Sequence, residues 1–256
     1  MKKFSPEFLE TTPEMPEYPG TMEDYTQNYR GAAATAAVAD RSTFIRRTYA
    51  HVAGAIVVFA ALEAMLIQAG AGEAVLRMMG ASKFSWLIVL GAFMGVSWLA
   101  NNWAHSEVSQ NMQYAGLGLY IAAEAFIFLP LLTIAAAWNP EIITQAALIT
   151  GALVAGITAV AVMTKKDFSF LGPFLMIGGF IALGTIAASI IFGFNLGLIF
   201  TSIMLLFAGG SVLYSTSNIL HQYRVDQHVA ASLSLFASIA LLFWYVLRLL
   251  MSLRSQ

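Results

Sequence analysis

The sequence predicts an all-α integral membrane protein built as a bundle of seven transmembrane helices. Three observations predict this class. Hydrophobic residues make up 59% of the chain, charged residues only 11%, and the mean hydropathy is +0.73, whereas roughly half of a soluble domain is apolar. Apolar runs of about 20 residues, the length that crosses a hydrocarbon core roughly 30 Å thick, recur along the chain. These runs are continuous and lack the alternation of transmembrane β-strands.

Residues 1–40 are predicted to form an acidic cytoplasmic tail outside the membrane. Four of the seven prolines lie here, together with six acidic residues between positions 7 and 24. Such a composition is typical of flexible, solvated segments. The tail lacks a basic start followed by an apolar core, so it does not resemble a cleavable signal peptide. It is either a solvated extension or a docking peptide for a soluble partner.

Residues 41–256 are predicted to form the seven-helix transmembrane domain. Its connections are short, which leaves no room for a second folded domain. The spans are expected near residues 48–70, 84–104, 114–136, 142–164, 170–193, 196–219 and 229–251.

The basic residues predict the orientation of the chain. An odd number of spans places the two termini on opposite sides, and cytoplasmic loops carry an excess of Lys and Arg. Close to the membrane, six basic residues lie on the side of the N-terminus and four on the other. We therefore expect a cytoplasmic N-terminus. The six are Arg41, Arg46, Arg47, Lys165, Lys166 and Arg224; the four are Arg77, Lys83, Arg248 and Arg254.

Glu124 is the most informative residue of the apolar spans. It lies near the middle of the third span, one to two turns before Pro130, which interrupts helical hydrogen bonding. An ionised carboxylate in hydrocarbon costs several kcal/mol unless it has a partner. Glu124 is therefore a candidate proton acceptor or cation ligand, or else a protonated group bonded to a neighbouring helix. Glu63 lies toward the far end of the first span and is expected to reach an interface.

The last two spans each carry a polar stripe at helical spacing. The stripes can line a hydrated path together with Glu124, or bond one helix to the other. They consist of Ser211, Ser215, Asn218 and Gln222 on the sixth span, and of Ser234, Ser238 and Tyr245 on the seventh.

The loop between these spans holds His221, Asp226 and His228. Histidine titrates near neutral pH. The loop is therefore either a cytoplasmic pH sensor or a simply solvated connection.

Other functions find no support in the sequence. There is no cysteine, so no thiolate metal site or disulfide framework is available, and the net charge of −1 does not indicate a nucleic-acid binder. No spacing resembles a zinc-protease helix, a phosphate-binding loop or a nucleophile elbow. We predict no catalytic residues, no metal site and no cofactor.

The stretch from Thr164 to Gly172 reads TKKDFSFLG. It resembles the signature that precedes the fifth span of the Bax inhibitor family. Residues 215–221 and 232–236 are similar to its last two spans, particularly in the bacterial YccA-type branch, and residues 46–49 fit the start of its first span. The resemblance covers about residues 40–250 and leaves out the acidic tail.

The resemblance implies a seven-helix bundle of the Bax inhibitor type with the last helix near its centre. It also implies a pH-sensitive calcium leak and, in eukaryotic members, restraint of cell death. The leak is associated with two facing aspartates, and the matching positions here are Ser215 and Ser238. A pair of serines cannot share a proton or switch charge. The paired-aspartate pH latch therefore does not carry over to this chain.

Two functions remain open. The first is suggested by the YccA-type branch, whose resemblance implies interaction with the membrane-bound AAA protease FtsH in a bacterial inner membrane; the chain would then modulate a protease or another membrane complex. The second is a leak path for calcium, another cation or protons, in which Glu124 is the intramembrane carboxylate, aided by Ser211, Ser215, Asn218 and Ser238.

Overall fold

The computed structural model describes residues 38–107, 109–164 and 166–254. All of the described residues belong to one compact unit. The predicted tail therefore lies outside the described residues, except for residues 38–40. These three residues are already helical. The first helix therefore begins before residue 41, the position at which we expected the transmembrane domain to start.

The described residues form eight α-helices. All except the short α3 are long and apolar enough to cross a membrane, which confirms the predicted seven-helix class. The helices are α2 (Val38–Gln68), α3 (Ala71–Gly80), α4 (Ser85–Ala104), α5 (Gln110–Trp138), α6 (Glu141–Thr164), α7 (Leu171–Phe192), α8 (Gly197–His221) and α9 (His228–Arg254).

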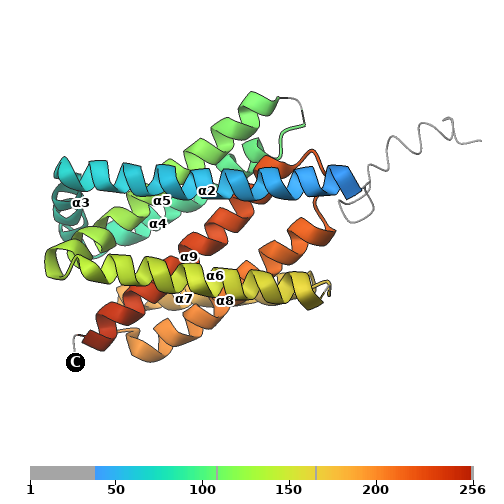
Figure 1. The fold of residues 1–256 in the computed structure, drawn as a ribbon. Coiled ribbons are helices and arrows are strands. Elements are labelled where there is room, and N and C mark those ends of the chain that lie inside the picture. The colour runs from blue at the N-terminus through green and yellow to red at the C-terminus, as the bar shows by residue number, and fades with distance from the viewer. Residues whose placement is uncertain (1–37, 108, 165, 255–256) are drawn as a thin grey trace, which may run out of the picture. The chain divides into compact units, whose positions relative to one another are not determined.

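The last helix lies at the centre of the bundle. In Figure 1, α9 (red) crosses the bundle obliquely, and it packs against α2, α5, α6 and α8. Within an apolar stretch of 18 residues in α9, 67% of the residues are buried inside the protein. The corresponding share is 50% for α5 and 6% for α7. Because α9 and α5 are the most enclosed spans, polar residues on them face protein rather than lipid.

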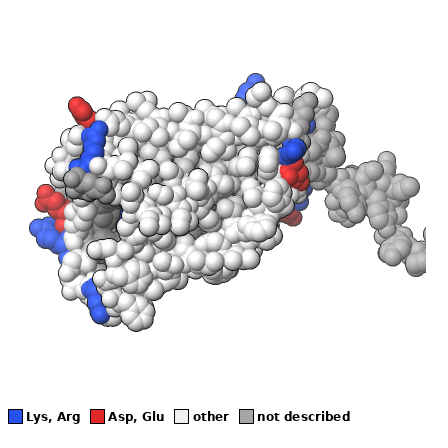
Figure 2. Space-filling model, turned by 90° about the horizontal axis from the view of Figure 1, so that it is seen from below, with Lys and Arg blue, Asp and Glu red and all other residues white. Residues whose placement is uncertain are grey.

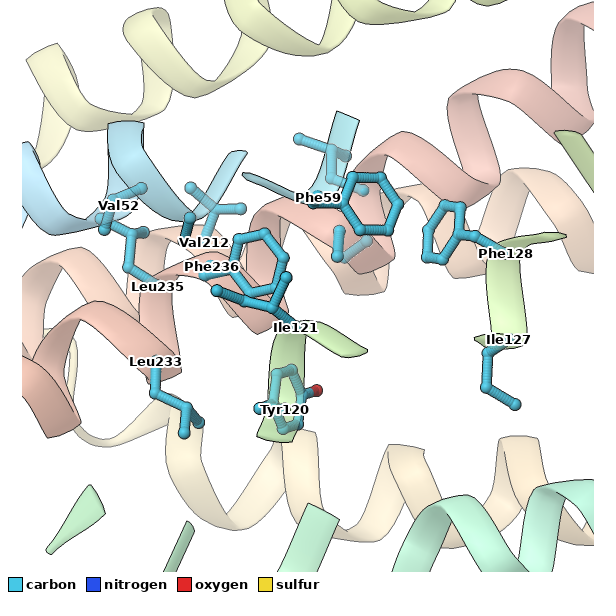
Figure 3. Packing of buried hydrophobic residues seen from close by; sticks show 14 of the residues in the cluster. Val52, Phe59, Tyr120, Ile121, Ile127, Phe128, Val212, Leu233, Leu235 and Phe236 are labelled. Atoms are coloured by element: carbon cyan, nitrogen blue, oxygen red, sulfur yellow. The ribbon is translucent and has the colours of Figure 1, made fainter. Parts of the chain in front are cut away.

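Aromatic side chains join α2, α5 and α9 in the core (Figure 3). The rings of Phe59 and Phe128 meet edge to face with centroids 5.2 Å apart, and Phe59 also contacts Phe236 at 6.0 Å. Tyr120 meets Phe236 in the same manner at 6.2 Å. Lipid supplies no hydrophobic drive between helices, so contacts of this kind stabilise the bundle through close packing.

The surface has the charge distribution of a membrane-spanning protein. On the face shown in Figure 2, Lys, Arg, Asp and Glu gather at the two ends of the helices and leave an uncharged belt between them. Large apolar side chains lie exposed within the spans, such as Phe174 and Phe180 on α7. This belt is the surface expected to contact the hydrocarbon of a bilayer.

The helix α3 was not expected from the sequence. It has ten residues, too few to cross a membrane, so it carries none of the long apolar signal that identifies spans. Gly70 precedes it with φ of 74°, a left-handed conformation that glycine adopts without steric cost. Gly72 packs against α5 so closely that a Cβ there would collide with the side chain of Thr133.

Gly116 sets the close approach of α4 and α5, and it provides a test of this packing. A Cβ at Gly116 would lie 2.5 Å from the carbonyl oxygen of Ala100 and 2.7 Å from the backbone nitrogen of Ala104. Because neither backbone atom can move alone, we expect Gly116→Ala to lower the free energy of unfolding by about 1–3 kcal/mol. Thermal unfolding in detergent measures the loss.

The matched control is Gly118→Ala on the same helix. A Cβ at Gly118 has nothing within 4 Å, so this change should leave stability unchanged or raise it slightly. Equal melting temperatures for the two variants would contradict the described α4–α5 contact.

Candidate functional site

A cavity of about 600 Å³ lies between α4, α5, α7, α8 and α9. This volume falls within the range of roughly 300–1,000 Å³ that is common for ligand pockets. Most of its wall is apolar. Its polar lining residues are Tyr120, Glu124, Ser189, Ser211, Ser238, Tyr245 and Arg248.

Glu124 reaches this cavity from α5 together with Tyr120. The two residues are four apart and therefore share one face of the helix. The Tyr120 hydroxyl donates a hydrogen bond to Oε1 of Glu124 at 2.8 Å, and the Glu124 side chain is buried, with 6% exposed. A single hydroxyl does not replace the hydration of an ionised carboxylate. The charged form therefore needs water or a cation from the cavity.

Four serines connect α8 and α9 beside the cavity. The Oγ atom of Ser238 lies 2.9 Å from that of Ser211 and 2.8 Å from that of Ser215. Ser215 also contacts the Oγ atom of Ser234 at 3.2 Å. The positions that match the family's aspartates, Ser215 and Ser238, are thus in direct contact. Hydroxyls at this distance bond to each other without changing charge.

The residues of the predicted path divide into three groups. Glu124, Ser211 and Ser238 line the cavity, while Ser215 does not line it and bonds to Ser238. Asn218 does not line it, and among the described residues its buried Oδ1 atom has no hydrogen-bond partner. Tyr120 was missed in the sequence, although its spacing from Glu124 was a usable signal.

The structure brings two of the three residues of the predicted pH-sensing loop near each other. Asp226 pairs with Arg224 and interacts electrostatically with His228, which is buried at the start of α9. His221 lies elsewhere, with Nδ1 3.0 Å from the carbonyl oxygen of Ser217.

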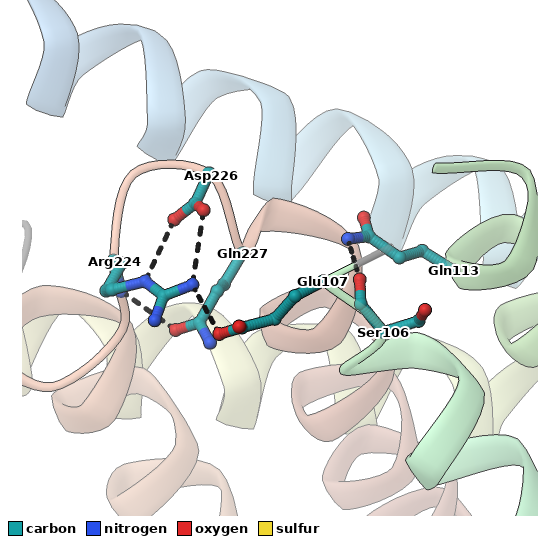
Figure 4. A network of polar contacts seen from close by, with 6 residues as sticks. All are labelled: Ser106, Glu107, Gln113, Arg224, Asp226 and Gln227. Carbon is teal, nitrogen blue, oxygen red and sulfur yellow. Dashed lines mark hydrogen bonds and ion pairs between the residues drawn. The ribbon is translucent and has the colours of Figure 1, made fainter. Parts of the chain in front are cut away.

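Arg224 connects two loops at this end of the bundle (Figure 4). Its guanidinium lies 3.2 Å from Asp226 and 2.9 Å from Glu107 of the loop between α4 and α5. The hydrogen bond to Asp226 is the main reason that the pKa of Arg224 is raised, and the hydrogen bond to Glu107 is the next. Partly exposed pairs of this kind contribute about 0–1 kcal/mol each. The network therefore aligns the loops more than it stabilises the fold.

His228 belongs to a cluster that joins α2, α5 and α9. The Tyr114 hydroxyl lies 3.2 Å from Nε2 of His51 and 3.4 Å from Nε2 of His228. The centroids of the two imidazole rings are 5.1 Å apart. These residues come from three distant parts of the sequence, so no local pattern indicated the cluster.

Asp167 fixes the segment that carries the family signature. Its Oδ1 atom accepts a hydrogen bond from the backbone N–H of Ser169 at 2.9 Å, and its Oδ2 atom accepts one from Gln222 at 3.0 Å. The backbone N–H of Phe168 donates to the Oγ atom of Ser217 at 2.7 Å. The bond from Ser169 is the main reason that the pKa of Asp167 is lowered. The signature segment is thereby held against the end of α8.

The fold and cavity define a multi-pass membrane protein with a polar site inside a seven-span bundle. The chain matches the family model Bax1-I, Inhibitor of apoptosis-promoting Bax1, over residues 41–255. It belongs to this family, as the sequence resemblance indicated.

Relatives from bacteria and animals match this chain. It is 27% identical over 233 residues to the uncharacterized protein NMA0420 of Neisseria meningitidis, which covers 87% of this chain and 96% of the relative. Protein lifeguard 4 of Mus musculus is 25% identical over 92% of this chain and 95% of its own length. The uncharacterized protein PA2604 of Pseudomonas aeruginosa is 34% identical, but the match spans only 43% of this chain and 49% of the relative. No solved structure matches.

The Asp167 contacts predict a pH-dependent stability difference. A lowered folded-state pKa means that the ionised group stabilises the fold above its unfolded pKa of about 3.9 and stops doing so as pH falls through the folded value. We expect wild type to unfold at a higher temperature than Asp167→Asn above about pH 5. This advantage should begin to shrink below about pH 4 and disappear once the pH has fallen through the lower folded value.

Thermal unfolding across a pH series tests this expectation, with Ser217→Ala as the control. That variant keeps the bond from the Ser169 N–H, which is the main cause of the shift, so it should retain the pH dependence. A wild-type advantage that grows on acidification would contradict the described geometry.

Proposed function

We propose that this protein is a leak pathway for protons or weakly bound cations across a membrane. The observation that carries the proposal is that Glu124, Ser211 and Ser238, from α5, α8 and α9, line one cavity within the bundle. In this pathway Glu124 is the group that takes up the proton or contacts the cation. The serine hydroxyls provide neutral oxygen atoms beside it.

The composition of the cavity favours transit over tight binding. Calcium takes six to eight oxygen ligands, and tight sites use several carboxylates. Among the residues that the structure describes, no three His, Asp or Glu side chains gather into a candidate metal site. A single carboxylate with hydroxyl neighbours suits a proton or a partly hydrated ion that enters and leaves quickly.

The serine pair removes one mode of control from this pathway. Two carboxylates in contact cannot both ionise freely, so such a pair changes its charge with pH. The hydroxyls of Ser215 and Ser238 lie 2.8 Å apart and stay neutral over the same range. The proposed leak therefore responds to pH through Glu124 and not through a paired latch.

The test is the replacement of Glu124 by glutamine in purified protein reconstituted into liposomes. Glutamine keeps the shape and the hydrogen bond to Tyr120 but cannot bind a proton or carry charge. We expect the proton or calcium flux of Glu124→Gln to fall about tenfold or more, as for loss of one principal charged group in an apolar site. Fluorescent pH and calcium indicators inside the liposomes report the flux.

Glu63→Gln is the matched control. Glu63 is a second buried carboxyl within a span, with 4% exposed, but it does not line the cavity. We expect its replacement to leave the flux unchanged. Equal flux in wild type and Glu124→Gln would remove the leak proposal.

A second candidate function is interaction with a membrane complex such as an FtsH-like protease. Two observations favour it. Ser215 and Ser238 stand where the family has its paired aspartates, and they contact each other without a carboxylate. The chain also carries the YccA-like segments. In this alternative the chain lies in a bacterial inner membrane with its N-terminus in the cytoplasm. The acidic tail is then available to the soluble part of the partner.

Co-purification in mild detergent tests this second candidate. We expect the full-length chain to retain a membrane AAA protease, and a chain lacking residues 1–37 to retain several-fold less of it, because the tail supplies the soluble contact. Unfolding temperatures should agree between the two chains. Equal retention would exclude the tail from the interaction, and no retention by the full-length chain would oppose the interaction itself.

A further inference from the structure

Arg248 brings a cation to the wall of the cavity. It lies on α9, less than two turns before the helix ends at Arg254, and it lines the 600 Å³ cavity. It also lines a second cavity of about 400 Å³, beside Trp138 and Thr201. Within the described part of the chain no hydrogen bond or ion pair reaches its guanidinium. Arg254, by contrast, donates to Gln145 at 2.6 Å.

The wall next to Arg248 is aromatic and apolar. Trp244 lies one turn before it on α9 and stacks on Trp86 of α4 with ring centroids 6.3 Å apart. Phe93 and Phe200 also line the cavity. An unpaired guanidinium beside such a wall suits a molecule with an anionic group at one end and a hydrocarbon chain at the other.

The cavity reaches the outer surface of the spans. Met94 of α4 lines the cavity and is exposed. Helix α7, which also lines the cavity, packs mainly against α8, and its large side chains such as Phe180 face outward. A hydrocarbon chain from the bilayer therefore has access to the cavity beside Met94 without passing through water.

We infer that the cavity binds one acyl chain of an anionic phospholipid from the surrounding bilayer, with the lipid phosphate on Arg248. The guanidinium forms paired hydrogen bonds with phosphate oxygens, which satisfies the unpaired group. A soluble anion would leave the aromatic wall without a partner. A zwitterionic lipid brings its own cation, which offsets the attraction to Arg248.

The bound chain would occupy the space that the proposed leak uses. Arg248 and Glu124 line the same cavity, so an acyl chain that enters past Arg248 displaces the water or ions that reach Glu124. Anionic lipid should therefore slow the leak. This consequence rests on the proposed function, whereas the lipid binding does not.

Native mass spectrometry of the full-length protein tests the binding without measuring any flux. The protein is offered phosphatidylglycerol and phosphatidylcholine with identical acyl chains. We expect wild type to retain phosphatidylglycerol over phosphatidylcholine by about fivefold, the effect of one cation next to an anionic headgroup. Arg248→Gln should lower this ratio to about one, and Arg248→Lys should keep most of it.

Arg254→Gln is the matched control, since it removes a cation from the same helix end without changing the cavity. We expect it to keep the wild-type ratio. A wild-type ratio in Arg248→Gln, or an equal loss in both variants, would overturn the inference.

A second measurement keeps the inference testable if Arg248→Gln does not fold. Trp98, Trp103 and Trp138 are replaced by Phe, which leaves the fluorescence of Trp86 and Trp244 in the cavity wall. Phosphatidylglycerol with brominated acyl chains should quench this emission saturably and at about fivefold lower concentration than brominated phosphatidylcholine. Equal quenching by the two lipids would overturn the inference, whatever the flux assay shows.

Discussion

A polar group inside a bilayer must find its partner within the protein, because hydrocarbon offers neither donor nor acceptor. This constraint explains why α9 is central. Its serines bond to those of α8, with 2.8 Å between the Oγ atoms of Ser238 and Ser215, and its first residue, His228, lies against Tyr114 of α5. The apolar positions of the same helix pack against α2 and α5. The polar contacts and the core therefore both depend on one enclosed helix.

The same constraint distinguishes the two buried carboxyls. Glu124 has Tyr120 and a cavity beside it. Both oxygens of Glu63 are buried and have no hydrogen-bond partner in the part of the chain that the structure describes. A carboxyl without a partner or water is stable only in its neutral form. Glu63 is thus suited to a static structural role, and Glu124 to one in which a proton or cation arrives and leaves.

The sequence predicted the bundle because each span carries its own apolar signal of about 20 residues. It also offered contact between the polar stripes of the last two spans as one of two interpretations, since stripes at helical spacing identify faces. It could not predict α3, which is too short to carry that signal, or the cluster of His51, Tyr114 and His228, which depends on the packing of three helices. The cavity could not be predicted either, because its volume depends on how loosely α7 packs. From the sequence, Arg248 was recognised only as a basic residue near the membrane.

The proposed leak requires that water reach the serines and Glu124 through the cavity. The chain has no cysteine, so one introduced thiol is unique. In phosphatidylcholine vesicles, a membrane-impermeant thiol reagent should label Ser211→Cys, which lines the cavity, far faster than Ser202→Cys, which is exposed on the same helix and lies outside the lining. Equal labelling rates at the two positions, or no labelling of Ser211→Cys, would contradict a water-accessible path to Glu124.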